Sequence, residues 1–195
     1  SWLLFAASVV LLLLPLGLVF VQSFNDVELA TAAGFRGFTL RWYHEVFVSG
    51  YYTDSFIVSV KVALAALAVS LIIAVPAAFA LARFPFRGRS ALLAFWLLPL
   101  TLPHVALGVG MLKLLQIYVA VPAFIGLVAI HVVVILPFAI TLLTASVIGL
   151  DEAQEEAAAS LGANAWKRLL LVIVPGLMPG LFATSIVGFL LSFDE

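Results

Sequence analysis

The sequence predicts an all-α integral membrane protein, and composition is the first observation that supports this. Hydrophobic residues make up 65% of the 195 residues, charged residues make up only 10%, and the mean hydropathy is +1.27. A soluble domain is usually about 45–50% apolar and about 25% charged. A chain of this length cannot bury so large an apolar excess in one core. With a net charge of −1 and no cysteine, the chain also lacks a basic field for nucleic acid and any thiolate metal site.

The second observation is a set of continuous apolar runs, each long enough to cross a bilayer. A helix needs about 20 apolar residues for this, whereas a strand of a membrane β-barrel alternates apolar and polar residues over about ten positions. The runs do not alternate, so we predict helices. The predicted spans cover residues 2–21, 56–82, 91–112, 124–148 and 169–191.

The first run differs from a signal peptide, because no small-residue cleavage site follows it and four more spans come after it. We therefore expect it to be retained. The chain starts with Ser1 and is apolar from the next residue, so we also expect natural sequence to precede it. All five spans are assigned to one transmembrane domain, residues 1–195.

Cations predict the orientation, because cytoplasmic links are enriched in lysine and arginine. The links at 83–90 and 149–168 lie on one side and carry Arg83, Arg87, Arg89, Lys167 and Arg168. The opposite links carry Arg36, Arg41 and Lys113. We therefore place 83–90 and 149–168 in the cytoplasm. An aromatic cluster within residues 38–52, on the opposite side, is typical of a short helix at the membrane interface.

Prolines and ionisable residues inside the spans are the next candidates for function. Pro99 and Pro103 fall in one span and predict an irregular, cavity-lining helix there. A deep histidine such as His131 either hydrogen-bonds across a helix pair or contacts substrate. Asp194 and Glu195 follow the fifth span, where they either face a cavity or are solvated rim charges. Gly176 and Gly180 form a weak helix-packing motif, because Pro179 interrupts it.

Residues 149–175 form the most informative segment, GLDEAQEEAAASLGANAWKRLLLVIVP. Four acids crowd the first turns of a predicted helix, where carboxylates favour the helix dipole, and alanines extend that helix. Gly162 suits the left-handed residue that closes a helix, Asn164 can cap a second helix, and Pro175 is expected to follow its end. The small side chains of the first helix predict a docking surface for a cytoplasmic protein.

This segment resembles the EAA motif of the permease subunits of binding-protein-dependent ABC importers. Glu156, Ala157 and Ala158 match the opening of the motif, Gly162 has the expected spacing, and Pro175 matches its end. Val172 and Val174 replace an isoleucine and a leucine of the motif. Further stretches are similar to the second permease subunit of spermidine/putrescine importers: FTLRWY at 38–43, RFPFRG at 83–88 and LSFDE at 191–195.

The resemblance implies a helical permease bundle of the type I, MetI-like kind, with five spans present and a sixth beyond residue 195. It implies a multi-pass protein of the bacterial cytoplasmic membrane that works with a second permease subunit, a pair of ATPase subunits and an external solute-binding protein. The loop at 149–175 would couple the bundle to the ATPase, which would use ATP and Mg²⁺. This chain would bind no cofactor and would transport rather than catalyse, in agreement with its lack of a nucleotide-binding or catalytic motif.

For a polyamine substrate, carboxylates and aromatic faces are needed. Asp194, Glu195, His131 and Trp96 are therefore the candidate substrate-path residues. Related branches carry iron, thiamine or phosphonate, which leaves the solute open. A secondary transporter, with an ion-coupling site at the deep His104 and His131, is the alternative from another class.

Overall fold

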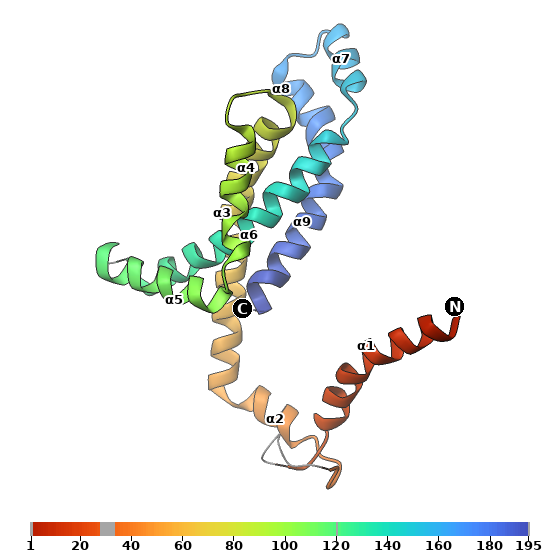
Figure 1. Cartoon of the computed structure of the whole chain (residues 1–195), viewed down its shortest axis with the longest axis vertical. Helices are drawn as coiled ribbons and strands as arrows, with labels where there is room; N and C mark the ends of the chain where they lie inside the picture. Colours follow the sequence, from red (N-terminus) through yellow and green to blue (C-terminus); the bar gives the residue numbers. More distant parts are fainter. Residues whose placement is uncertain (1, 28–33, 120, 195) are drawn as a thin grey trace. The chain divides into compact units, whose positions relative to one another are not determined.

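The computed structural model describes residues 2–27, 34–119 and 121–194. Within this part of the chain the structure is helical, apart from short links and one isolated β-bridge between Asn25 and Phe38. The elements, shown in Figure 1, are α1 (Trp2–Gln22), α2 (Arg41–Val48), α3 (Gly50–Arg83), α4 (Arg89–Leu97), the 3-10 helix η1 (Leu98–Thr101), α5 (His104–Leu114), the π-helix η2 (Leu115–Val119), α6 (Ala123–Ile148), α7 (Glu152–Ser160), α8 (Ala165–Arg168), the π-helix η3 (Leu169–Ile173) and α9 (Val174–Asp194). The fold is therefore all-α, as the sequence predicts.

Four helices are long and apolar enough to cross a membrane, and a fifth crossing exists if a bent pair forms one span. That pair is Arg89–Thr101 with Val105–Leu114, and its two parts meet at 105°. The predicted span at 91–112 is thus not one continuous helix. Leu102 and Pro103 adopt extended ψ angles of 142° and 127°, because a proline disfavours the helical conformation of the residue before it and lacks the N–H that would continue the ladder.

The chain divides into two compact units, of which the first ends at Ile57. The first unit contains the predicted aromatic cluster and the predicted short helix, α2. Phe24 stacks on Phe38 with ring centroids 5.2 Å apart, and Trp42 donates its indole N–H to the Asn25 carbonyl at 2.9 Å. The Asn25 side chain is buried and bonds Gln22, Gly34 and Arg36. The side-chain amide of Asn25 therefore holds together the end of α1 and the residues that precede α2.

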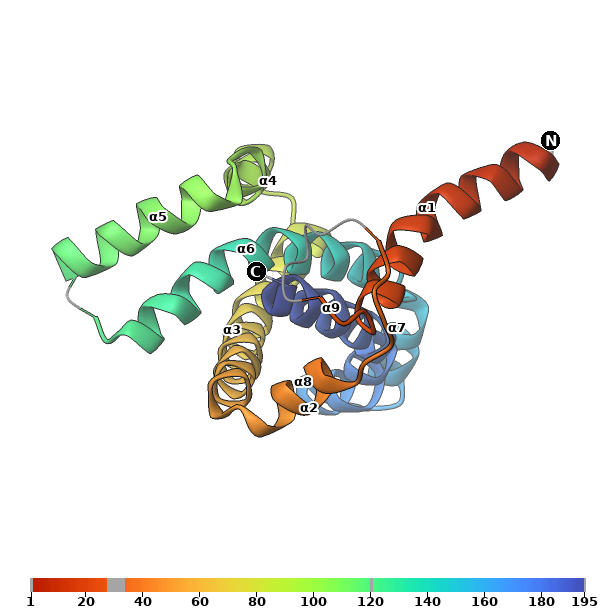
Figure 2. The ribbon, with the colours of Figure 1, turned by 90° about the horizontal axis from the view of Figure 1, so that it is seen from below.

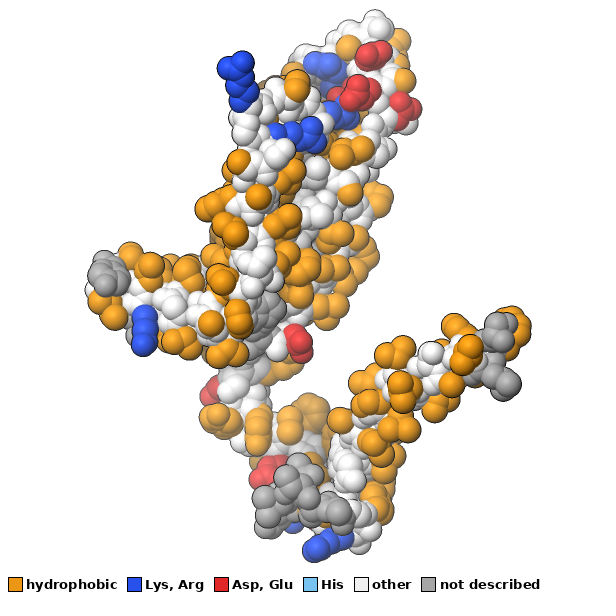
Figure 3. Space-filling model, in the orientation of Figure 1, with side chains coloured by type: hydrophobic (Ala, Val, Ile, Leu, Met, Phe, Trp, Pro, Cys, Tyr) orange, Lys and Arg blue, Asp and Glu red, His pale blue; other side chains and the backbone are white. Residues whose placement is uncertain are grey.

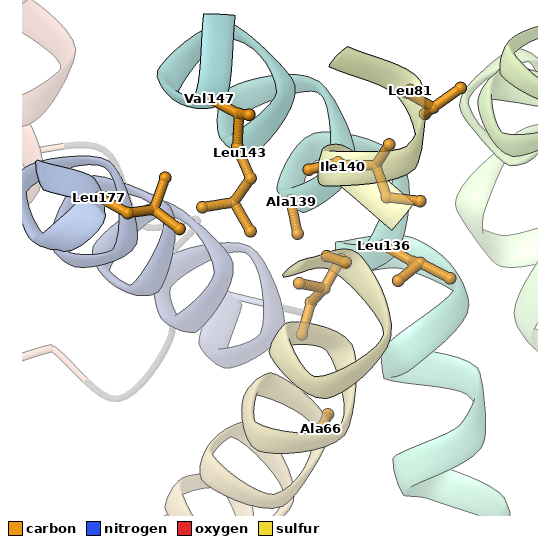
Figure 4. Close-up of a cluster of buried hydrophobic side chains, with 11 residues drawn as sticks. Ala66, Leu81, Leu136, Ala139, Ile140, Leu143, Val147 and Leu177 are labelled. Carbon is orange, nitrogen blue, oxygen red and sulfur yellow. The ribbon is translucent and has the colours of Figure 1, made fainter. Parts of the chain in front are cut away.

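The second unit, from Val58 onward, is built around α6, which packs on α3 and α9 (Figure 2). Figure 4 shows the core that these helices share, with Leu81 from α3, Leu143 and Val147 from α6, and Leu177 from α9. Lipid chains are as apolar as leucine, so helices in a membrane associate through close packing rather than through hydrophobic burial.

Small residues four positions apart make this close approach possible. On α9 they are Gly176, Gly180, Thr184, Gly188 and Ser192, which we call the α9 seam. A Cβ added at Gly188 would lie 2.9 Å from Leu67 Cδ1 and 3.1 Å from Ile135 Cγ2, and one at Gly176 would lie 2.8 Å from Leu150 Cδ2. The sequence understates this motif, because Pro179 points to disruption whereas the helix continues through it.

Candidate functional site

The candidate site is the segment from Asp151 to Pro175, whose first half is the helix α7. The side chain of Asp151 accepts a hydrogen bond from the Ala153 N–H at 3.0 Å, so it caps the helix N-terminus. Glu152 and Glu155 occupy the first turn, where the helix dipole favours negative charge. The helix forms where the sequence predicts it, with the acids in its first turns as expected; the cap by Asp151 was not predicted.

A Schellman motif ends α7. Gly162 has a φ of +84° and donates its N–H to the Ala159 carbonyl at 2.9 Å, and Ala163 donates to the Ala158 carbonyl at 3.0 Å. This pair of bonds satisfies carbonyls that the helix leaves unpaired, and it needs a left-handed residue, which glycine supplies without strain. The predicted role of Gly162 in closing the helix is confirmed.

Every residue of α7 is exposed or half-buried. Glu156 and Ala157 are exposed and Ala158 is half-buried, so the three residues form an accessible small-residue surface with one carboxylate. Two large apolar side chains flank it: Leu161 is 89% exposed and Trp166 is 71% exposed. Figure 3 shows Lys, Arg, Asp and Glu side chains gathered at this end of the second unit, over the otherwise apolar bundle.

Sequence reasoning missed a contact between α7 and the end of α3. The Arg83 guanidinium bonds two carboxylates of α7: Nη1 bonds Glu152 Oε1, and Nη2 bonds Glu155 Oε1 at 2.8 Å. The Arg83 and Glu155 side chains are only 19% and 22% exposed. The signal in the sequence was a pair of acids three positions apart, on one helix face, but nothing local selects Arg83 from the neighbouring cations.

The second half of the segment differs from the prediction at its end. Asn164 caps α8 by accepting from the Lys167 N–H at 2.9 Å, as predicted. The chain then remains helical through η3 into α9, and Ala165–Asp194 forms one apolar helix of 30 residues. Pro175 therefore does not follow a helix end but lies in the first turn of α9. The wider π-helical turn before it lies where a proline, which lacks an N–H, interrupts the α-helical ladder.

The structure describes three of the four candidate substrate-path residues, and it places two of them, His131 and Trp96, in different cavities. His131 Nδ1 lies 2.8 Å from Ser192 Oγ, a bond between α6 and α9, and His131 also lines a cavity of about 310 Å³ between α5 and α6. Trp96 lines a different, apolar cavity of about 220 Å³, and its buried Nε1 has no hydrogen-bond partner among the described residues. Asp194 is exposed at the end of α9, and Glu195 lies outside the described residues.

Two polar residues that sequence reasoning missed accompany these positions. Ser192 is 4% exposed and belongs to the α9 seam, so its hydroxyl is available to His131 at the helix interface. Thr184, on the same seam, is 1% exposed, and its hydroxyl has no partner among the described residues. No group of three or more potential metal ligands occurs in the described part of the chain.

A family model described as binding-protein-dependent transport system inner membrane component matches residues 70–195. The chain is similar to the spermidine/putrescine transport system permease protein PotC of Haemophilus influenzae, with 27% identity over 94% of this chain and 71% of that protein. It is 29% identical to the putrescine transport system permease protein PotI of Escherichia coli, over 93% of this chain and 66% of PotI. The molybdate/tungstate transport system permease protein WtpB of Thermococcus kodakarensis is 26% identical over 93% of this chain and 68% of WtpB.

Proposed function

Since the chain belongs to the family of binding-protein-dependent transport system inner membrane components, we propose that it is a permease subunit coupled to a separate ATPase through the α7 segment. Family membership and the apolar helices make it a multi-pass protein of the cytoplasmic membrane. The chain spans 66–71% of the length of the relatives described above, so the activity of the whole transporter is part of the proposal.

The accessible surface of α7 is the observation that supports this coupling role. Glu156, Ala157 and Ala158, followed at Gly162 by a left-handed turn, reproduce the spacing of the EAA motif on an exposed helix. Small side chains let a partner approach the helix backbone closely. The exposed Leu161 and Trp166 would add apolar contact area, and Glu156 would offer a carboxylate to a cation of the partner.

In this mechanism the permease moves and its partners perform the chemistry. An ATPase dimer that binds ATP and Mg²⁺ would close and carry α7 with it, and the bundle would then open toward an external solute-binding protein. A second permease subunit would complete the path. The residues Glu156, Ala157, Ala158, Gly162 and Pro175 would transmit force without reacting.

Substitution of Gly162 tests this role. The φ of +84° strains any side chain, although no atom lies within 4 Å of an added Cβ. Gly162→Asn, which tolerates the left-handed region, should keep ATP-driven uptake in the reconstituted transporter, whereas Gly162→Val should uncouple uptake from hydrolysis. Gly110→Ala, a helical glycine that also has open space, is the matched control. Wild-type uptake by Gly162→Val, or failure of any ATPase subunit to co-purify with the wild type, would overturn the proposal.

We further propose that the solute is a polyamine. The names of PotC and PotI, and the exposed Asp194 carboxylate at the end of α9, support a polycation. Trp96 and His131 remain candidate path residues, and each lines a cavity beside α6. Glu195 completes the proposed acidic pair.

Uptake of labelled putrescine and spermidine into proteoliposomes is the direct test. Replacing Asp194 and Glu195 with amides should lower polyamine uptake, while a control variant, Asp54→Asn, should not. The similarity to WtpB makes a molybdate or tungstate permease the second candidate, which anion uptake without polyamine uptake would favour. Uptake of iron, thiamine or phosphonate instead would move the chain to another branch. Uptake driven by an ion gradient without ATP would indicate a secondary transporter.

A further inference from the structure

The contact between Arg83 and α7 links two elements that are far apart in the sequence. α7 packs chiefly against α8 and η3, its neighbours along the chain, and has no fully buried side chain of its own among its nine described residues. The chain joins α7 to α6 on one side and to α9 on the other. Arg83, the last residue of α3, supplies a third attachment, which depends on side chains rather than on chain connectivity.

The geometry of this attachment restricts movement. Nη1 and Nη2 of one guanidinium each bond a different carboxylate, Glu152 and Glu155, so both the position and the rotation of α7 relative to α3 are defined. Arg83 lies at the negative end of the α3 dipole, and the two acids lie at the positive end of the α7 dipole. Each charge is thus stabilised by its own helix as well as by its partner.

The acids of α7 therefore divide into two groups. Glu152 and Glu155 are directed to Arg83, whereas Glu156 is exposed and forms no ion pair within the described part of the chain. Two acids of α7 therefore attach it to the bundle, while Glu156, one turn after Glu152, remains exposed and available to a partner. Arg87, in the link that follows α3, is also exposed and forms no ion pair with a described residue.

We propose that Arg83 is the positioning residue that makes α3 move with α7, so that the displacement of α7 by the ATPase is passed directly to a third transmembrane helix. This inference rests on the proposed function and deepens it. We call the paired bonds of Arg83 to Glu152 and Glu155 the Arg83 fork. Without it, α7 would still bind the ATPase but would rotate relative to α3, and less solute would be transported for each ATP hydrolysed.

The test uses the complete transporter, with its ATPase and binding protein, in proteoliposomes. Arg83→Gln should leave ATPase co-purification unchanged but lower the solute transported per ATP hydrolysed by about fivefold or more, the lower end of typical coupling factors. Arg87→Gln is the matched control and should behave like the wild type. A charge-swapped triple variant, Arg83→Glu with Glu152→Gln and Glu155→Arg, should recover most of the loss, which a folding defect would not allow.

A distance measurement separates positioning from other effects. The chain contains no cysteine, so spin labels can be attached through Phe84→Cys and Gln154→Cys, both at exposed positions. The distribution of label distances should keep its width between the nucleotide-free and ATP-bound states, and Arg83→Gln should broaden it. Wild-type transport per ATP in Arg83→Gln, no recovery in the charge-swapped variant, or an unchanged distribution would overturn the inference. If no ATPase co-purifies with the wild type, the proposed function itself fails instead.

Discussion

Gly180→Ala tests the close packing of α9 on α6. An added Cβ would lie 2.5 Å from Ser146 Cβ and would also meet Ser146 Oγ. Non-bonded carbon atoms are normally about 3.5–4.0 Å apart, and Ser146 Cβ is attached directly to the backbone, so the helices must separate by roughly 1 Å. Overpacking of this kind costs about 1–3 kcal/mol, which corresponds to a fall of about 2–12 °C in Tm for a chain of this size.

Thermal unfolding of the purified chain in detergent, followed by the soluble fraction that remains after heating, measures this fall. Two second-site variants decide whether the Cβ contact causes it. Ser146→Gly removes the opposing Cβ and should restore the Tm of Gly180→Ala, whereas Ser146→Ala keeps that Cβ and should not. Both remove the Ser146 hydroxyl, which donates to the Leu142 carbonyl at 2.9 Å, but a glycine inside α6 itself costs about 1 kcal/mol. Each second-site variant is therefore measured with and without Gly180→Ala, and the double-mutant cycle isolates the packing term. An unchanged Tm in Gly180→Ala, or equal rescue by both variants, would refute the reasoning.

Three further predictions each concern one polar side chain. The Asn25 side chain is 3% exposed and makes three hydrogen bonds, which Asn25→Ala removes. This variant should be cleaved faster by proteases between α1 and α2. An unchanged cleavage rate would show that the Asn25 amide does not organise this segment. Ser192→Ala takes the hydroxyl partner from His131 Nδ1 and should lower the Tm by about 2–4 °C, whereas Ser185→Ala, which loses only a bond within α9, should change it less. Asn164→Ala removes the cap of α8 at a cost of about 1 kcal/mol, so hydrogen exchange at the Lys167 amide should become about fivefold faster. Asn164→Asp keeps a capping oxygen and should not change the exchange rate. Equal exchange rates in the two variants would contradict the cap.

The helices were predictable where one physical requirement dominates. The run 124–148 becomes α6, Ala123–Ile148, because a lipid environment forces a continuous apolar segment to satisfy its own backbone. α7 was predictable for a different reason, since its caps and acids act within one turn of the positions they stabilise.

The remaining features depend on contacts between distant segments or on the sum of weak local preferences. Pro99 and Pro103 predict an irregular span, but they do not predict the bend of 105° between its two parts. Pro175 suggests a helix end, whereas η3 and α9 continue because the apolar segment around it has no better conformation in lipid. The Arg83 fork is visible only when the end of α3 is placed beside α7.

Of the candidate site residues, Gly162, Ala157 and Ala158 lie as the local pattern predicts, because their environment is mainly their own helix. His131 and Trp96 do not share a cavity, because each faces a different gap between α6 and the α4–α5 segment. The sequence indicates a break at Pro103 but not its direction, so it did not predict which cavity each residue would line.

The contact between Leu150 and Gly176 has a mechanical consequence. Leu150 precedes α7 and Gly176 follows it, so the two ends of the loop that carries α7 lie close together. A load applied to α7 should therefore reach α6 and α9 at neighbouring points. It is either delivered to the pair as a common displacement or dissipated by melting the loop itself.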